Sequence, residues 1–160
     1  MSVTHSNAQV LSGQAQLNNF SAEGNTFAVG DIIPAVSVIM PNFNCEKFIL
    51  GAVNSVLSQT FTDLELIVVD DCSTDKSVEI VEDIARKDGR VVLLKNSENK
   101  GAAFCRNRGV KAARGRYIAF LDSDDLWTED KLRKQLAFMK EGGYAFSCTS
   151  YDHIDRKSVV

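Results

Sequence analysis

The chain has 160 residues, of which 44% are hydrophobic and 24% are charged, and its formal net charge at pH 7 is -3. These values are ordinary for a globular protein with one packed core, and the slight acidic excess gives no reason to expect a nucleic-acid partner. No apolar run approaches the ~20 residues that span a bilayer, and the first residues do not predict a signal peptide. The cysteines form no CxxC pair, which favours reduced thiols in a cytosolic protein over disulfides or a zinc site.

Residues 1–33 differ in composition from the rest of the chain. Ser, Asn, Gln, Thr and Gly dominate this segment, and its apolar residues are isolated. Such a segment buries too little apolar surface to offset the entropy lost on ordering. We therefore expect two parts, a flexible polar extension over 1–33 with at most a weak element around Phe27 to Ile33, and a folded portion over 34–160.

Strands and helices are predicted in alternation along the folded portion. The first strand is expected over Ala35–Met40, between Pro34 and Pro41, and the first helix over Glu46–Ser58, where apolar residues recur at helical spacing. The later elements are strand 64–69, a helix from 73 or 74 to about 87, strand 91–94, helix 102–113, strand 118–121, helix 128–140 and strand 144–149. This order predicts an α/β fold with a mostly parallel sheet covered by helices on both faces.

Carboxylates gather where two of the predicted strands end. Asp70 and Asp71 end the second strand, and Asp122, Asp124 and Asp125 follow the fourth, whose continuous apolar run predicts a strand buried on both faces. Like charges this close repel one another unless a cation lies between them. Carboxylate oxygens suit Mg²⁺ or Mn²⁺, particularly when phosphate supplies the remaining ligands. Because parallel strands end at one edge, one group could bind a base or ribose while the other holds a metal against a diphosphate.

Simpler interpretations of the same polar residues remain open. The acidic group after the fourth strand could cap the next helix, and the pair after the second could form an Asx turn. Asn42 and Asn44 could likewise be turn formers. Arg106 and Arg108 could face phosphate, although a solvated position is equally favoured for Arg108.

Several common α/β functions are excluded because their motifs are missing. The loop after the first strand, residues 41–44, has no glycine, whereas a dinucleotide-binding fold places GxGxxG there. The P-loop pattern GxxxxGK[ST] and the hydrolase pattern GxSxG are also absent. The two histidines, His5 and His153, lie in the polar extension and near the end of the chain, so a histidine-based triad is not expected.

A family pattern is carried by three segments, which read VSVIMPNFN, SVLSQTFTDLELIVVDDCSTD and NKGAAFCRNRGVKAARGRYIAFLDSDDLW. Together, over roughly residues 35–150, they resemble the amino-terminal half of the family 2 glycosyltransferases. The resemblance implies an inverting enzyme with the GT-A fold, a nucleotide-sugar donor that is most often a UDP-sugar, and Mn²⁺ or Mg²⁺ as cofactor. The chain departs from the family at Cys72, where Gly is usual, and at Cys105, where Ala is usual.

The resemblance also implies roles for residues at the first two strand ends. By position, Pro41, Asn42 and Phe43 line the nucleoside pocket. Asp71 corresponds to the residue that contacts the base, with Asp70 beside it.

The acidic group after the fourth strand matches the family's DxD element. Its last aspartate, Asp124, is expected to bind the metal, and Asp122 is expected to lie near the ribose and at the metal site, with Ser123 between them. The preceding segment is expected to border the ribose and diphosphate through Asn99, Gly101, Arg106 and Asn107.

The family's acceptor-activating aspartate lies well downstream of DxD, which places the expected general base and the acceptor pocket beyond Val160. Asp152 and Asp155 follow the last predicted strand too closely to be substitutes. We therefore expect a donor-binding half of a GT-A domain, incomplete at its carboxyl end, that binds a nucleotide-sugar without transferring it. The expected acceptor is a glycan, lipid-linked or other.

Two other functions stay open at this stage. One is a nucleotide-binding module without catalysis. The other is a phosphoacceptor receiver domain, although its acidic pair ends the first strand, whereas here a complete strand and helix precede Asp70. The expected location is the cytoplasm, with peripheral association at the cytoplasmic face of a membrane, because many members of the family act on acceptors there.

Overall fold

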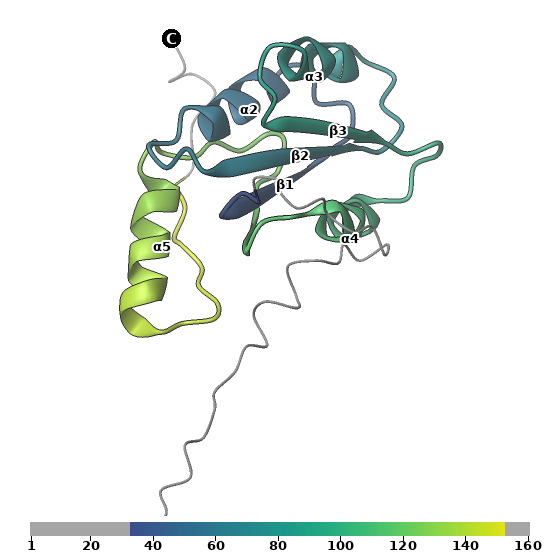
Figure 1. Ribbon diagram of the computed structural model, residues 1–160. Coiled ribbons are helices and arrows are strands. Elements are labelled where there is room, and N and C mark those ends of the chain that lie inside the picture. The colour runs from purple at the N-terminus through teal and green to yellow at the C-terminus, as the bar shows by residue number, and fades with distance from the viewer. Residues whose placement is uncertain (1–32, 153–160) are drawn as a thin grey trace, which may run out of the picture.

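The computed structural model describes residues 33–152 and shows one parallel sheet between helices (Figure 1). The strands are β1 (Val36–Asn42), β2 (Leu64–Asp70), β3 (Val91–Lys95) and β4 (Tyr117–Phe120). The helices are α2 (Ile49–Leu57), α3 (Ser77–Ala85), α4 (Ala102–Ala112) and α5 (Lys131–Gly142). The strand order is β3-β2-β1-β4 and all three pairings are parallel, which confirms the predicted fold class.

Both faces of the sheet are covered by helices. Alternate residues of β1 and β2, such as Val38 and Leu66, pack in the cluster that α2, α3 and α5 complete on one face. On the other face Ile67 and Val69 pack beneath α4. Every residue of β1 and β2 is buried, as expected for central strands of a doubly covered sheet.

The strand β4 differs from the prediction of a strand buried on both faces. Ile118 is 40% exposed and Phe120 is 48% exposed, whereas Tyr117 and Ala119 pack against the core on the opposite face. The reason is that β4 is an edge strand of the described sheet, and α4 packs on β1 and β2. The prediction is therefore wrong for one of the two faces.

The prediction of a strand over 144–149 is also wrong, because these residues, which the structure describes, form neither a strand nor a helix. The helix α5 ends at Gly143, whose φ of 64° places it in the left-handed region. The chain then turns back along α5 (Figure 1), where the Tyr144 ring packs 5.0 Å from the Phe138 ring and Gln135 Nε2 donates to the oxygens of Ser147. These contacts hold the segment against its own helix and away from the sheet.

The polar extension predicted over 1–33, with its weak element around Phe27 to Ile33, lies outside the described residues except for Ile33. Among the described residues, none of the helices has both the length and the apolar composition to cross a membrane.

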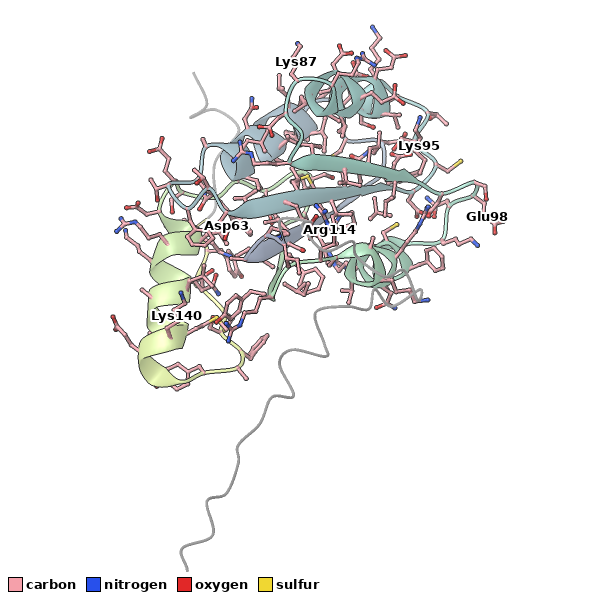
Figure 2. All side chains as sticks on the ribbon, viewed as in Figure 1. Asp63, Lys87, Lys95, Glu98, Arg114 and Lys140 are labelled. Atoms are coloured by element: carbon pink, nitrogen blue, oxygen red, sulfur yellow. The ribbon has the colours of Figure 1, made fainter. Side chains whose placement is uncertain are left out.

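A charged group is buried near the amino ends of the strands. Glu65, only 3% exposed, accepts hydrogen bonds from Ser37 Oγ at 2.5 Å and from Arg114 through its backbone N at 2.8 Å and Nε at 2.9 Å. Gly115 N donates to Ser37 Oγ at 2.7 Å. Figure 2 shows Arg114 beside the sheet, while Lys87, Glu98 and Lys140 lie at the periphery. A buried carboxylate is tolerated only when paired and hydrogen-bonded, so this network fixes where the chain enters β4.

We expect Gly115→Ala to lower the free energy of unfolding by about 1–3 kcal/mol, the usual cost of forcing an extra carbon into packed structure. A Cβ at this position would lie 2.4 Å from the backbone N of Ser37, which cannot move away as a flexible side chain could. The matched control is Gly89→Ala, whose added Cβ meets nothing within 4 Å. Urea unfolding of both variants is the measurement, and equal stabilities would contradict the close approach.

Candidate nucleotide-binding site

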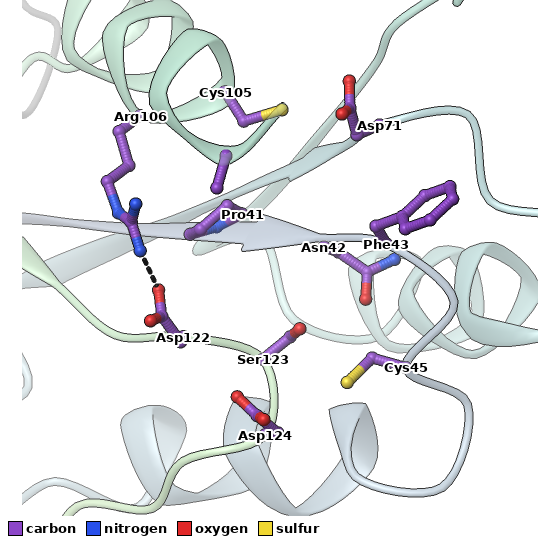
Figure 3. Close-up of a pocket in the computed structure, with 11 residues that line it drawn as sticks. Pro41, Asn42, Phe43, Cys45, Asp71, Cys105, Arg106, Asp122, Ser123 and Asp124 are labelled. Carbon is purple, nitrogen blue, oxygen red and sulfur yellow. Dashed lines mark hydrogen bonds and ion pairs between the residues drawn. The ribbon is translucent and has the colours of Figure 1, made fainter. Parts of the chain in front are cut away.

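A cavity of about 240 Å³ opens where β1, β2 and β4 end at their carboxyl edge (Figure 3). Such an edge is where open α/β sheets bind their ligands. The lining residues come from the loops after these three strands and from the start of α4: Pro41, Asn42, Phe43, Cys45, Asp71, Ala102, Cys105, Arg106, Asp122, Ser123 and Asp124.

Most of the residues predicted from the sequence meet in this cavity. Of the eleven predicted nucleotide or metal ligands, those that line it are Pro41, Asn42, Phe43, Asp71, Arg106, Asp122, Ser123 and Asp124. The parallel sheet thus brings both acidic groups to one edge, as the strand-end pattern indicated. Asp70, Asn99 and Gly101 are outside the lining, and Asn107 is exposed on α4.

Asp70 is directed into the loop network rather than into the cavity. It is 2% exposed, and its oxygens accept hydrogen bonds from Asn42 Nδ2 at 2.7 Å and from Ser73 Oγ at 2.5 Å. Asn44 joins the same network, because Asn44 Oδ1 accepts from Thr74 N at 2.8 Å. The turn-forming interpretation therefore holds for Asn44 and Asp70, whereas Asn42 both braces the loop and lines the cavity.

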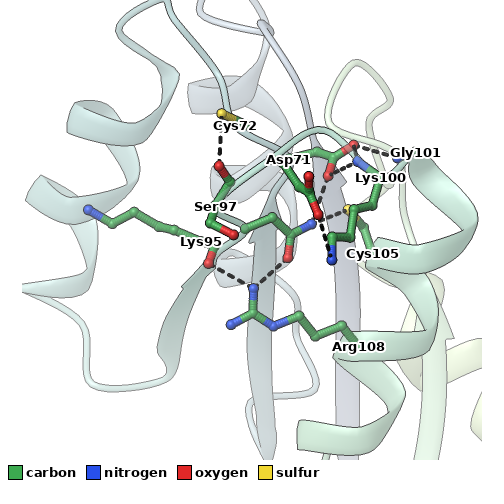
Figure 4. Close-up of polar contacts among 10 residues, drawn as sticks. Asp71, Cys72, Lys95, Ser97, Lys100, Gly101, Cys105 and Arg108 are labelled. Carbon is green, nitrogen blue, oxygen red and sulfur yellow. Dashed lines mark hydrogen bonds and ion pairs between the residues drawn. The ribbon is translucent and has the colours of Figure 1, made fainter.

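The Asp71 carboxylate, only 3% exposed, is held by N–H groups of the segment that follows β3 (Figure 4). Oδ1 accepts from Asn96 Nδ2 at 2.7 Å and from Lys100 N at 2.9 Å, and Oδ2 accepts from Gly101 N at 2.7 Å. Burial alone would raise the pKa of Asp71, but the hydrogen bonds from Lys100, Asn96 and Gly101 outweigh burial and lower it. The cavity therefore contains a buried carboxylate that stays ionised.

Gly101 acts on the site through its backbone. Its φ of 83° lies in the left-handed region, and this conformation at the start of α4 turns its N–H toward Asp71. Asn99 is exposed in the same loop, so its predicted role at the ribose or diphosphate stays a prediction.

The other acidic group lies on the opposite side of the cavity from Asp71 and is less buried. Asp122 Oδ1 accepts a hydrogen bond from Arg106 at 2.5 Å, and both side chains are partly exposed. Asp124 is exposed and has no ion-pair or hydrogen-bond partner among the described residues. Burial, and then the charges of Asp124 and Asp122, raise the pKa of Asp125. Negative charge is thus concentrated at this end of the cavity.

A divalent ion fits this site only if the ligand supplies part of its coordination. Among residues 33–152, no group of three or more His, Cys, Asp or Glu is arranged to hold a metal by itself. Asp122 is paired with Arg106, which leaves Asp124 as the carboxylate available to a cation. One or two protein carboxylates completed by phosphate oxygens and water is a usual environment for Mg²⁺, so the residues fit an ion shared with a diphosphate.

Two residues that shape the Asp71 side of the cavity, Asn96 and Cys105, are not among the site residues predicted from the sequence. Asn96, which holds Asp71, comes directly after β3, so extending the strand-end rule to the third strand would have found it. Cys105, at a position where the family usually has Ala, also lines the cavity. Its burial, and then the charge of Asp71, raise the pKa of the Cys105 thiol to about 11, so the thiol stays protonated.

The family model described as "Glycosyl transferase family 2" matches residues 37–160. A Bacillus subtilis (strain 168) protein named as a teichuronic acid biosynthesis glycosyltransferase, TuaG, is 49% identical over 118 residues, which are 74% of this chain and 47% of that relative. An Escherichia coli protein, WfaP, named as a UDP-Glc:alpha-D-GlcNAc-diphosphoundecaprenol beta-1,3-glucosyltransferase, is 44% identical over 125 residues, 78% of this chain and 49% of the relative. The chain thus spans about half the length of the curated relatives it matches.

Solved structures agree with the sequence relatives. The Staphylococcus aureus TarS 1–349 structure in complex with UDP superposes with a TM-score of 0.62 at 38% identity, covering 66% of this chain and 32% of TarS 1–349. TarS 1–349 has also been solved with UDP-GlcNAc. A mannosyltransferase from Pyrobaculum calidifontis, solved with GDP-Man and Mn²⁺, superposes with a TM-score of 0.62 at 28% identity, covering 66% of this chain and 32% of that protein.

We expect acid to remove stability that the ionised Asp71 provides. Its pKa is lower in the folded chain than the ordinary value of about 3.9, so this contribution is complete above about pH 4 and is lost as pH falls through the folded-state pKa. Asp71→Asn removes the titrating group, and the free energy of unfolding of this variant should therefore fall less steeply than that of the wild type below about pH 4. Urea unfolding across that range is the measurement, and parallel curves would show that the Asp71 pKa is not depressed.

Proposed function

This chain belongs to glycosyl transferase family 2, and we propose that it holds a nucleotide-sugar donor, specifically a UDP-sugar, for an inverting glycosyl transfer. The observation that carries the proposal is the pairing, in one cavity, of a buried ionised Asp71 with the exposed acidic pair Asp122 and Asp124. The first is suited to accept hydrogen bonds from a base, and the second to hold a cation against a diphosphate.

The cavity has a nucleoside end and a diphosphate end. At the first, Asp71 lies with Pro41 and Phe43, and the 50% exposed ring of Phe43 offers an aromatic surface to a base. At the second, the Arg106 guanidinium lies between α4 and the acidic loop, within reach of a group that carries negative charge. The UDP and UDP-GlcNAc complexes of TarS support a uridine nucleotide as the ligand.

We assign the divalent cation, Mn²⁺ or Mg²⁺, to Asp124 with Asp122 beside it. When bound, the ion offsets the negative charge that develops on the departing nucleoside diphosphate. The Mn²⁺ complex of the Pyrobaculum mannosyltransferase supports the use of such an ion. The chain's own contribution is to orient the diphosphate and to hold Asp122 in an ion pair with Arg106.

We propose that the acceptor pocket and the general base lie in the part of the family's fold that this chain does not span. The WfaP name includes a sugar linked to undecaprenol through a diphosphate, which supports a lipid-linked acceptor for this chain. With such an acceptor we propose peripheral association at the cytoplasmic face of a membrane. The test is an assay of sugar transfer by the whole protein, from a panel of UDP-sugars to a prenyl-diphosphate-linked sugar. The mass of the product is the readout. Nucleotide binding without any transfer or donor hydrolysis would favour the second candidate, a binding module without catalysis.

We expect UDP to bind this chain weakly without a divalent cation and more tightly with Mn²⁺, because the cation offsets repulsion between the diphosphate and the acidic loop. Asp124→Asn should remove most of the Mn²⁺ effect, since a neutral amide is a poor ligand for a hard cation. The control is Asp125→Asn, which removes the neighbouring carboxylate outside the cavity lining and should keep the effect. Calorimetry with Mn²⁺ or EDTA is the measurement, and affinity indifferent to chelation would exclude Asp124 as a ligand.

We also expect Asp71→Ala to weaken uridine and UDP equally, by about ten- to a hundred-fold, because a hydrogen bond to an ionised group contributes roughly 1.5–3 kcal/mol. Asp124→Ala should instead weaken UDP much more than uridine, since its contact runs through the cation to the diphosphate. Competition binding with both ligands and both variants measures the difference. The division of roles is refuted if each variant weakens both ligands to the same extent.

A further inference from the structure

Asn96, the residue after β3, makes contacts on both sides of its amide group. Figure 4 shows Arg108 and Asp71, which lie on the two sides of Asn96. Its Nδ2 donates to Asp71 Oδ1 at 2.7 Å and to Cys105 Sγ at 3.3 Å. Its Oδ1 accepts from Arg108 at 2.5 Å, and the same nitrogen of Arg108 donates to the backbone oxygen of Lys95 at 2.8 Å. A chain of hydrogen bonds therefore runs from Arg108 through Asn96 to the carboxylate that faces the cavity.

This chain of contacts fixes the orientation of the Asn96 amide. The oxygen and nitrogen of an amide have nearly the same shape, and only their partners decide which way the group points. A guanidinium can only donate, so Arg108 selects the amide oxygen, and the amide N–H groups are thereby directed at Asp71. Arg108, for which the sequence leaves phosphate contact and a solvated position open, does not line the cavity. It is anchored on Lys95 and Asn96.

The hydrogen bonds to Asp71 leave little of its accepting capacity for a ligand. An ionised carboxylate has about four acceptor positions. The N–H groups of Asn96, Lys100 and Gly101 supply three donors, of which Lys100 N is shared between the two oxygens, at 2.9 Å from Oδ1 and 3.1 Å from Oδ2. The Cys105 thiol, a weak donor, is the other neighbour of the carboxylate, and a ligand N–H can displace it. Three N–H donors and one displaceable thiol thus leave a place for one ligand N–H. This matches a base that presents a single imide N–H, as uracil does, better than guanine, which presents two adjacent N–H groups.

We propose that Asn96, held by Arg108, is a positioning residue for donor recognition that sets Asp71 to bind one imide N–H. The proposal rests on the proposed function, because it requires a nucleotide base to occupy the Asp71 end of the cavity. Asn96 does not touch the donor; it acts by filling one acceptor position of Asp71 and by fixing the rotation of the carboxylate. Removing its amide frees that acceptor position, so a base with two N–H donors can bind nearly as well as uracil. The carboxylate is then also less firmly oriented, so it distinguishes uracil less from a base that has no N–H donor.

The experiment compares the affinities of the 160-residue chain for UDP, for N3-methyl-UDP and for GDP, all with Mn²⁺. In N3-methyl-UDP a methyl group replaces the imide hydrogen, so the ratio of the two affinities reports on the contact between Asp71 and N3 of the base. The wild type should prefer UDP over N3-methyl-UDP by about ten-fold, the usual effect of one hydrogen bond to a charged group. Asn96→Ala should weaken UDP, leave N3-methyl-UDP nearly unchanged and narrow the gap between UDP and GDP.

Arg108→Ala should act in the same direction but less strongly, because the amide remains and has lost only the partner that orients it. Arg108→Lys, which keeps one donor, should restore part of the preference for UDP. The matched control is Asn54→Ala, which removes an exposed amide on α2 and should leave all three affinities unchanged. Circular dichroism of each variant verifies that the fold is intact.

The outcomes separate this inference from the proposed function. If the wild type prefers UDP and Asn96→Ala keeps the same ratio between UDP and N3-methyl-UDP, the positioning role of Asn96 is overturned while the donor site stands. Equal weakening of UDP and N3-methyl-UDP by Asn96→Ala would show a merely structural role and also overturns the inference. If the wild type binds none of the three nucleotides, the proposed function fails and this inference fails with it.

Discussion

The parallel pairing of β1 with β2 on one side and with β4 on the other decides where the polar groups of the site lie. In this register Asn42 is opposite Asp70, so the loops after β1 and β2 leave the sheet side by side. Ile39 is opposite Phe120, and β4 therefore delivers Asp122 to the same edge. A parallel sheet directs all its strands one way, and segments some 30 to 80 residues apart in the chain consequently meet in one cavity.

The structure stabilises its two acidic groups in different ways, and this difference underlies the proposed division of roles. Asp71 is buried, and backbone and amide N–H groups from one loop hold it in its ionised form. Asp122 and Asp124 are partly or fully exposed; one is paired with Arg106 and the other is left to water or a cation. A buried carboxylate held by several hydrogen bonds is rigid and suits recognition of a base. An exposed acidic pair can change partners, as binding of a metal and a diphosphate requires.

Buried polar groups also hold the framework around the cavity. Gln59 links α2 to α5, because its Nε2 donates to Thr128 O at 2.7 Å and its Oε1 accepts from Leu132 N at 3.0 Å. The Glu65 network joins β1 and β2 to the segment that enters β4. Gln59 thus holds the start of α5 against the end of α2, and the Glu65 network holds the start of β4 beside β1.

The sequence by itself determined the α/β class, the order of the elements and most of the cavity lining. These features follow from local signals: apolar runs, helical spacing, and carboxylates directly after strands, which parallel pairing must bring together. Local signals could not decide between neighbours such as Asp70 and Asp71, because which carboxylate turns inward depends on the partners that each meets across the sheet. Nor could they reveal that Asn96 and Arg108 hold Asp71, since this contact forms only when the β3 and α4 segments pack against β2. The errors at β4 and at 144–149 have the same cause. An apolar run has the same sequence whether it is covered on two faces, covered on one, or packed against its own helix, and only the tertiary structure determines what covers it.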